Sequence, residues 1–320
     1  MGTFSETTLP KISYFYPKTR IIISIVALVF ASQILPEIVS NILAVAVVVS
    51  IGLMHGATDH ILYINSEDAE FTSKIPKSFI IKYLFILAGM GAIWLIIPEL
   101  ALISFLIISA YHFGQTQLQY IPVSESSWSK KLLYTTWGVL ILALIVLLNL
   151  EESKGLIISA IPSLDLSILS DDTSQLIILS SLILTIVVFI GLHKKLNWRL
   201  VAFEILEVLV IAYFSLQTNL LVSFGLFFGL WHSLRASQVQ IDKVSLKQEF
   251  NTKLFIKESL PFTLISIFGI SLMLLGTYYF GSQIRAEMLF LVAISMLTLP
   301  HMFIYERFYN YFDTLSAKQN

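Results

Sequence analysis

Long apolar segments follow one another along almost the whole of this 320-residue chain. Hydrophobic residues make up 56% of it and charged residues only 13%, whereas ordinary soluble domains carry about a quarter charged residues. A helix needs roughly 20 mostly apolar residues to cross a bilayer core, and about 17 suffice. The pattern therefore predicts an all-α, polytopic integral membrane helical bundle and excludes a soluble fold.

Ten segments meet this length criterion, and short polar breaks separate several of them. Connections such as 35–37, 98–99 and 218–219 are so short that the helices on either side must be antiparallel neighbours. The segment 150–174 is interpreted as a polar loop whose apolar patch is too short to span. No repeat with a period of 20–50 residues is present. The predicted spans are 20–36, 38–63, 78–97, 99–118, 131–149, 175–192, 199–217, 219–238, 261–280 and 285–309.

Lysine and arginine predict the orientation of the bundle, because they are retained in cytoplasmic segments. With the N-terminus inside, 18 of the 20 fall on the cytoplasmic side, and only Lys154 and Arg285 lie outside. We therefore expect both termini, including a short tail over 1–19, to be cytoplasmic in a multi-pass protein of the cell (inner) membrane. The basic start followed by apolar residues resembles a signal peptide, but no small-x-small cleavage site follows, so it is interpreted as the uncleaved first span.

The segment 239–260 is polar, with lysines at intervals and apolar residues between them. Two interpretations remain open: a cytoplasmic loop lying on the membrane surface near anionic headgroups, or a positive loop that only sets topology.

Net charge and cysteine content exclude further classes. The net charge of −1 argues against nucleic-acid binding, which would require a basic surplus. Because cysteine is absent, the sequence excludes disulfides, thiolate metal sites and cysteine nucleophiles.

Four of the six histidines lie inside predicted spans that all run from outside to inside: His55, His112, His232 and His301. Each lies about 12 to 17 residues from the outer end of its span, so at 1.5 Å per residue all four fall within about 7 Å of one level. One such histidine would usually be hydrogen-bonded to a neighbouring helix. Four at one depth favour a shared metal ion, because an ionisable group in hydrocarbon is costly without a partner.

The ligand type narrows the choice of metal. Neutral imidazole suits iron, zinc, copper and nickel. Four imidazoles would usually close a tetrahedral zinc site, whereas they leave one or two open positions on an octahedral iron. We therefore expect Fe(II), one per chain.

Two neighbours of His55 are candidates for supporting or replacing these ligands. Asp59 follows it by four residues, on the same face, and could accept a hydrogen bond from its imidazole. His60 lies about 140° round the helix and should face elsewhere, so it is an alternative ligand only. His193 is expected in a lysine-rich cytoplasmic turn.

Two carboxylates, Glu204 and Glu207, lie at the depth of the histidines in the seventh predicted span. They are further candidates for supporting the metal ligands, because an intramembrane carboxylate commonly marks a functional site. A simple ion pair of Glu204 with Arg235 or Arg199 is equally consistent with the sequence.

Small and aromatic residues accompany the histidines. Glycine lets a helix or a ligand approach closely, and aromatic rings can line a slot for a long apolar molecule. The residues expected to form such a slot are Gly56, Tyr111, Phe113, Gly114 and Trp231.

The motifs HGATDH at 55–60, SAYHFG at 109–114, LWHSLR at 230–235 and LPHM at 299–302 resemble those of the Brp/Blh family. Its members are membrane-embedded bacterial and archaeal β-carotene 15,15′-dioxygenases that supply retinal to microbial rhodopsins. The resemblance implies that residues 1–320 form one membrane-embedded catalytic domain whose histidines hold a non-haem iron. It further implies that O2 splits the central double bond of β-carotene into two molecules of all-trans-retinal, which can pass to a rhodopsin.

The chain departs from the family pattern at one position. Many members carry a further histidine just after the arginine of the third motif, where this chain has Ala236. His301 is then the expected fourth ligand. Since a carotene is too apolar to leave the bilayer, we also expect the site to open laterally to lipid.

Three other functions remain as alternatives. A membrane di-iron desaturase or hydroxylase would carry about eight histidines in HxxxH and HxxHH boxes, which this chain lacks. A metal or proton transporter would show inverted repeats, broken helices and carboxylates at several depths. A structural partner of a rhodopsin would need no metal.

Overall fold

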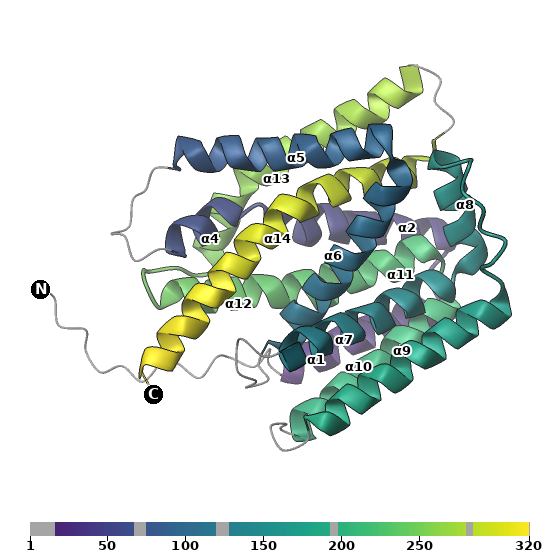
Figure 1. The fold of residues 1–320 in the computed structure, drawn as a ribbon, viewed down its shortest axis with the longest axis horizontal. Coiled ribbons are helices and arrows are strands. Elements are labelled where there is room, and N and C mark those ends of the chain that lie inside the picture. Colours follow the sequence, from purple (N-terminus) through teal and green to yellow (C-terminus); the bar gives the residue numbers. More distant parts are fainter. Residues whose placement is uncertain (1–16, 67–74, 120–127, 193–197, 280–283, 320) are drawn as a thin grey trace, which may run out of the picture.

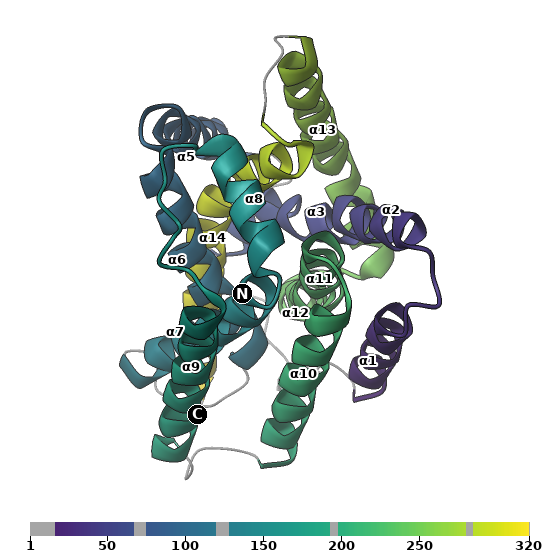
Figure 2. The ribbon, with the colours of Figure 1, turned by 90° about the vertical axis from the view of Figure 1, so that its right-hand side faces the viewer.

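The computed structural model describes residues 17–66, 75–119, 128–192, 198–279 and 284–319. Over these residues the chain is helical and contains no strand, which confirms the predicted all-α class. The helices run in several directions: some lie along the long axis of the molecule and others cross them obliquely (Figure 1; Figure 2 gives the view from the side).

Two of the four histidine-bearing segments are not regular helices. The first consists of α2 (Glu37–Val47), the π-helical turn η1 (Val48–Gly52), α3 (Leu53–Gly56), a break, and α4 (Asp59–Asn65). The second consists of α11 (Leu220–Leu226), the π-helical η3 (Phe227–Ser233) and α12 (Leu234–Ser245). The other two are α6 (Pro98–Leu118) and α14 (Ala286–Gln319).

The remaining helices surround these four. They are α1 (Pro17–Ala31), α5 (Lys77–Ile96), α7 (Trp128–Leu147), α8 (Leu150–Ala160), α9 (Asp171–Gly191), α10 (Trp198–Gln217) and α13 (Thr252–Tyr279).

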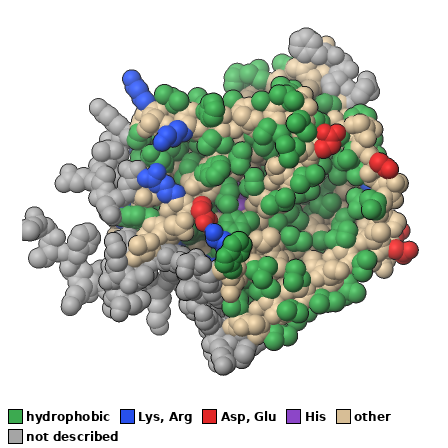
Figure 3. Space-filling model, viewed as in Figure 1, with side chains coloured by type: hydrophobic (Ala, Val, Ile, Leu, Met, Phe, Trp, Pro, Cys, Tyr) green, Lys and Arg blue, Asp and Glu red, His purple; other side chains and the backbone are tan. Residues whose placement is uncertain are grey.

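Seven helical segments of the described chain are long and apolar enough to cross a membrane, which indicates a multi-pass membrane protein. The other three predicted spans are also helical, as α1, α6 and α10, but do not meet both criteria over their described residues. In α6 the polar run Gln115–Gln117 lowers the hydropathy. Ten spans and two cytoplasmic termini therefore stay predictions. Figure 3 shows a largely apolar face, with most Lys and Arg toward its left and most Asp and Glu at its right edge.

Two segments expected to be loops are largely helical. Within 150–174, α8 forms because Leu150, Ser153 and Leu156, spaced three residues apart, share one buried face. In 239–260, α12 continues to Ser245 and α13 begins at Thr252, so the connection between them is short. Lys243 of this segment is buried over the rings of Tyr309 and Phe312.

Close backbone contact joins α6 to α7. A Cβ atom on Gly114 would collide with the backbone of Tyr134, and one on Gly138 would collide with the backbone of Ala110. Small residues of this kind let membrane helices approach each other closely. This contact fixes the position of α6, and with it the position of His112.

Candidate metal centre

The four histidines predicted from the sequence meet at one point in the bundle. The ring centroids of His55 and His112 each lie 4.9 Å from that of His232 and 5.0 Å from that of His301. Ligand atoms of His55, His112 and His232 all lie within 4.8 Å of one another. All four side chains are buried. Four segments far apart in the sequence thus supply one compact cluster of imidazoles.

The irregular turns bring two of these segments together at the cluster. η1 ends three residues before His55, and His232 lies within η3 itself. The two turns pack against each other because Gly229 leaves room for Val47, and Gly52 leaves room for the ring of Phe228. π-helical turns are rare and often occur at functional sites.

His301 follows a proline inside α14. Pro300 lacks a backbone N–H, so the helical hydrogen bond to the preceding turn is missing there. Figure 1 shows that α14 bends along its length. Such bends are usually found at proline.

Two of the imidazoles have hydrogen bonds that select which nitrogen faces the centre. His55 Nδ1 donates to the Gly52 carbonyl oxygen, 2.5 Å away, since a carbonyl can only accept. His301 Nδ1 lies 2.6 Å from Asp59 Oδ1, where a carboxylate accepts. In each ring Nε2 is then left with a free lone pair, the arrangement found in metal-binding histidines. The sequence predicted Asp59 beside His55, but Asp59 contacts His301 instead, because the break after Gly56 turns it toward α14.

Several ring nitrogens of the cluster have no partner among the described residues. These are both nitrogens of His112 and of His232, together with Nε2 of His301. Buried polar atoms are normally hydrogen-bonded, so each exception requires an explanation. Neutral imidazoles that converge without protein partners fit a metal ion, which accepts one nitrogen from each ring.

The helix break after His55 is stabilised by Gln240. The break frees the His55 carbonyl oxygen, which accepts from Gln240 Nε2 at 2.9 Å and from Thr58 Oγ1 at 2.9 Å. Thr58 Oγ1 also contacts Gln240 Oε1 at 2.9 Å. These bonds hold α3, α4 and α12 in fixed positions around the centre.

A largely apolar cavity of about 300 Å³ reaches the cluster, and all four histidines contribute to its wall. Ile80 and Leu84 of α5 and Ile265 of α13 line the same cavity, yet they are 44%, 56% and 64% exposed on the outer surface of the bundle. The cavity therefore extends from the histidines to the exposed apolar surface of the bundle between α5 and α13. We call it the lateral cavity.

The comparisons with known proteins agree with this geometry. The family described as Beta-carotene 15,15'-dioxygenase matches residues 46–309, which include all four histidines and Asp59. The chain belongs to this family. A comparison with curated proteins and one with solved structures each gave no match. The bundle and its histidine cluster are therefore those of a member of a carotenoid dioxygenase family, which favours the dioxygenase interpretation over the transporter alternative.

Only part of the expected substrate slot lines the lateral cavity of this dioxygenase family member. Gly56 and Phe113 do so. Tyr111 points elsewhere, its hydroxyl donating to Glu306 at 3.2 Å. Trp231 stacks on Phe214, and Gly114 is used for the packing of α6 on α7. These three do not line the lateral cavity, because neighbours on a helix point in different directions, and a role for them in substrate binding stays a prediction.

His60 and Ala236 also lie near the cluster. His60 lines the lateral cavity with its ring against Phe262, centroids 4.5 Å apart, and it is not part of the four-ring cluster. Ala236, the position at which the sequence was seen to depart from the family pattern, is fully buried in α12. His301 completes the cluster in this member of the dioxygenase family. His193 lies outside the described residues.

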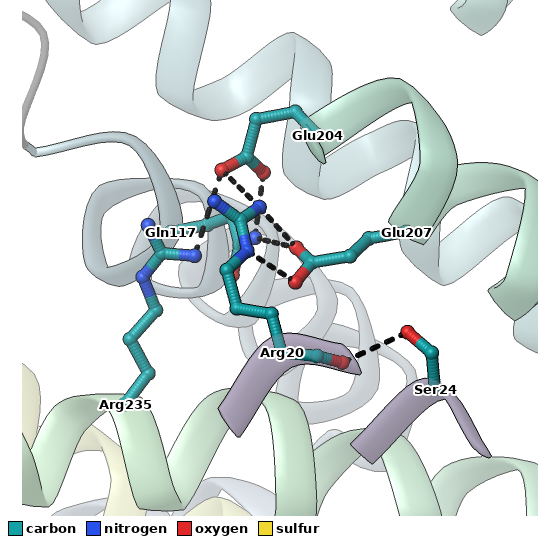
Figure 4. A network of polar contacts seen from close by, with 6 residues as sticks. All are labelled: Arg20, Ser24, Gln117, Glu204, Glu207 and Arg235. Carbon is teal, nitrogen blue, oxygen red and sulfur yellow. Dashed lines mark hydrogen bonds and ion pairs between the residues drawn. The ribbon is translucent and has the colours of Figure 1, made fainter. Parts of the chain in front are cut away.

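The two carboxylates of α10 form a separate network of polar contacts (Figure 4). Arg20 donates to Glu207 at 2.6 and 2.7 Å and to Glu204 at 2.7 Å. Gln117 Nε2 donates to both carboxylates at 2.6 Å, and Arg235 lies 3.5 Å from Glu204. The ion pair of Glu204 with Arg235 is thus present. Among the described residues, the partners of these carboxylates are thus the two arginines and Gln117, and a supporting role toward the metal ligands stays a prediction.

Sequence reasoning missed three residues that organise the interior of this family member. Arg20 was counted only as a topogenic charge, although its position at the start of an apolar segment is itself a sign of burial. Gln117 and Gln240 are neutral amides in or beside predicted spans, where their hydrogen-bonding groups require partners. Such residues could have been identified as candidates, but not their partners.

Proposed function

We propose that this member of the family is a membrane-embedded, iron-dependent dioxygenase that cleaves the central double bond of β-carotene with O2 to give two molecules of all-trans-retinal. Central cleavage and the iron rest on the family resemblance and on the donor set of four neutral imidazoles. A rhodopsin is the acceptor that the resemblance suggests for the retinal, within the cell membrane.

One observation carries the proposal. The lateral cavity joins the histidine cluster to the lipid-facing surface between α5 and α13. A polyene dissolved in the bilayer could enter it without crossing water. The dominance of apolar residues in its wall suits such a substrate, since ligand sites match the polarity of what they bind.

The residues of the centre would have different roles in the reaction. Nitrogen atoms of His55, His112, His232 and His301 would hold Fe(II), which supplies the chemistry of O2 when bound. Asp59 and the Gly52 carbonyl hold two of the imidazoles in the required tautomer. Apolar side chains such as Phe113 and Phe228 exclude water and hold the polyene beside the cluster.

Expression in a host that accumulates β-carotene tests the proposal. We expect bleaching, with retinal accumulating at up to two molecules for each carotene lost. Protein purified without oxygen should contain about one iron per chain by elemental analysis. Stoichiometric zinc in active material would exclude the iron, and the absence of bleaching would exclude β-carotene as substrate.

A further inference from the structure

A second cavity, of about 450 Å³, lies next to the lateral cavity. We call it the inner cavity. Phe113 contributes to the walls of both. Its ring lies 4.7 Å from that of His232 and 5.1 Å from that of Phe227, centroid to centroid. The two cavities thus adjoin at a single aromatic residue that stands directly beside the histidine cluster.

The inner cavity extends from the histidine level toward the N-terminal ends of three histidine-bearing helices. On α6 it is lined by Leu102, Phe105, Leu106 and Ser109, which all precede His112. On α11 it is lined by residues that precede η3, and on α14 by residues that precede His301. The lateral cavity and the inner cavity therefore lead away from the cluster in different directions.

The length of the inner cavity suits a long apolar chain. Leu102 precedes His112 by ten residues, which is ~15 Å along a helix. An extended carbon chain of about twelve bonds covers this length, since three backbone bonds span at most roughly 3.3–3.6 Å. Half of β-carotene, a chain of about nine bonds that ends in a ring, is of this size.

Apart from Ser109, its polar groups lie at the far end, where most of them are hydrogen-bonded and Arg285 pairs with Glu287 at 3.3 Å. Asn219 donates to Glu37 at 3.3 Å and to Asn41 at 2.8 Å, and Glu152 accepts from the Leu220 N–H at 2.8 Å. Nearer the histidines the wall is apolar apart from Ser109. A path for ions would instead need polar groups along its length.

We propose that the inner cavity holds one half of the polyene while the lateral cavity holds the other, so that the central double bond lies at the histidine cluster beside Phe113. This inference rests on the proposed function. The lateral cavity alone, at about 300 Å³, is at the small end of ligand pockets, roughly 300–1,000 Å³, and a polyene of about forty carbon atoms needs more room. Because the lateral cavity and the inner cavity meet at the cluster, the middle of a bound polyene would lie there, which explains why cleavage would be central.

Tryptophan substitutions that fill the inner cavity test this arrangement. Leu106→Trp on α6 and Leu142→Trp on α7 both place a large ring in it. Their matched controls are Ile107→Trp and Val139→Trp, which lie on the same helices but are 62% and 39% exposed. The substrates are β-carotene and β-apo-12′-carotenal, which keeps one ring and the central double bond but has a truncated second half.

Both cavity variants should lower β-carotene turnover roughly ten-fold or more, because added bulk in a filled site is not accommodated. Their turnover of β-apo-12′-carotenal should stay close to that of the wild type. Under argon, the wild type and the controls should retain β-carotene through size-exclusion chromatography, and the cavity variants should lose it. Unchanged β-carotene turnover in both variants, or equal loss of both substrates with iron content retained, would overturn the inference. A wild type that cleaves neither substrate would instead refute the proposed function.

Discussion

Two groups of buried polar side chains lie within this apolar bundle, and they differ in how they are satisfied. In the network around Arg20, two arginines face two carboxylates, and Gln117 bonds to both acids. In the histidine cluster, nitrogens of His112, His232 and His301 have no partner among the described residues. The charged and polar groups of the first network are partnered by one another. The nitrogens named in the second group are left available to a further ligand, such as a metal ion.

The free-energy cost of burying charged and neutral polar groups explains why the two groups of side chains should have different roles. A buried charge is tolerated when an opposite charge and hydrogen bonds compensate it, and removing one member of such a pair leaves the other uncompensated. Unpartnered imidazoles carry no charge when neutral, so their burial is cheaper and they remain available to a metal. The network should therefore affect stability and the cluster should affect activity.

The largest expected effect is on activity. His112→Ala should abolish retinal formation and lower the iron content, because the iron loses a ligand, while the protein remains folded and extractable. Retinal assay and elemental analysis measure both. His193→Ala, which we expect in a cytoplasmic turn, should behave as the wild type. An active His112→Ala variant with full iron would break the assignment of the cluster.

The next effect is on stability. Arg20→Met should lower the free energy of unfolding by about 3–5 kcal/mol, because it leaves two buried carboxylates facing only Arg235 and Gln117. Thermal unfolding in detergent measures this. Lys154→Met, which removes only the exposed pair with Glu151, should change stability by less than about 1 kcal/mol. If Arg20→Met kept its stability but lost iron, the division between the two groups would be wrong.

A smaller effect should separate metal affinity from stability. Asp59→Asn removes the carboxylate that accepts from His301, and should weaken iron binding about 10–100-fold. Competition with a chelator measures the affinity, and thermal unfolding should change little. Asp171→Asn, at the exposed start of α9, is the matched control. Equal iron affinity in both variants would show that the hydrogen bond does not support the site.

The smallest effect concerns His60. His60→Ala removes a ring that contacts Phe262 in the lateral cavity, and should lower activity only about two- to ten-fold, as expected for one lost aromatic contact. Iron content should not change. If this variant were inactive and His301→Ala active, the ligands would be His55, His60, His112 and His232.

The four histidines were predictable from the sequence because of their depth. In a bilayer, position along a helix translates directly into height, so residues on different spans can be compared by counting. The direction in which each side chain points was less predictable. Tyr111 and Phe113 flank His112 in the sequence, yet Tyr111 bonds to Glu306 whereas Phe113 stands between the two cavities.

The sequence by itself determined the class of the protein, the helical segments and the four histidines, because hydropathy and helix geometry act locally. The tertiary structure decided which partners these residues have. Several features depend on contacts between distant segments. They are the π-helical turns before His55 and at His232, the hydrogen bond between Asp59 and His301, and the pairing of Arg20 with Glu204 and Glu207. Such contacts follow from side-chain packing between helices, which no periodicity within one helix specifies.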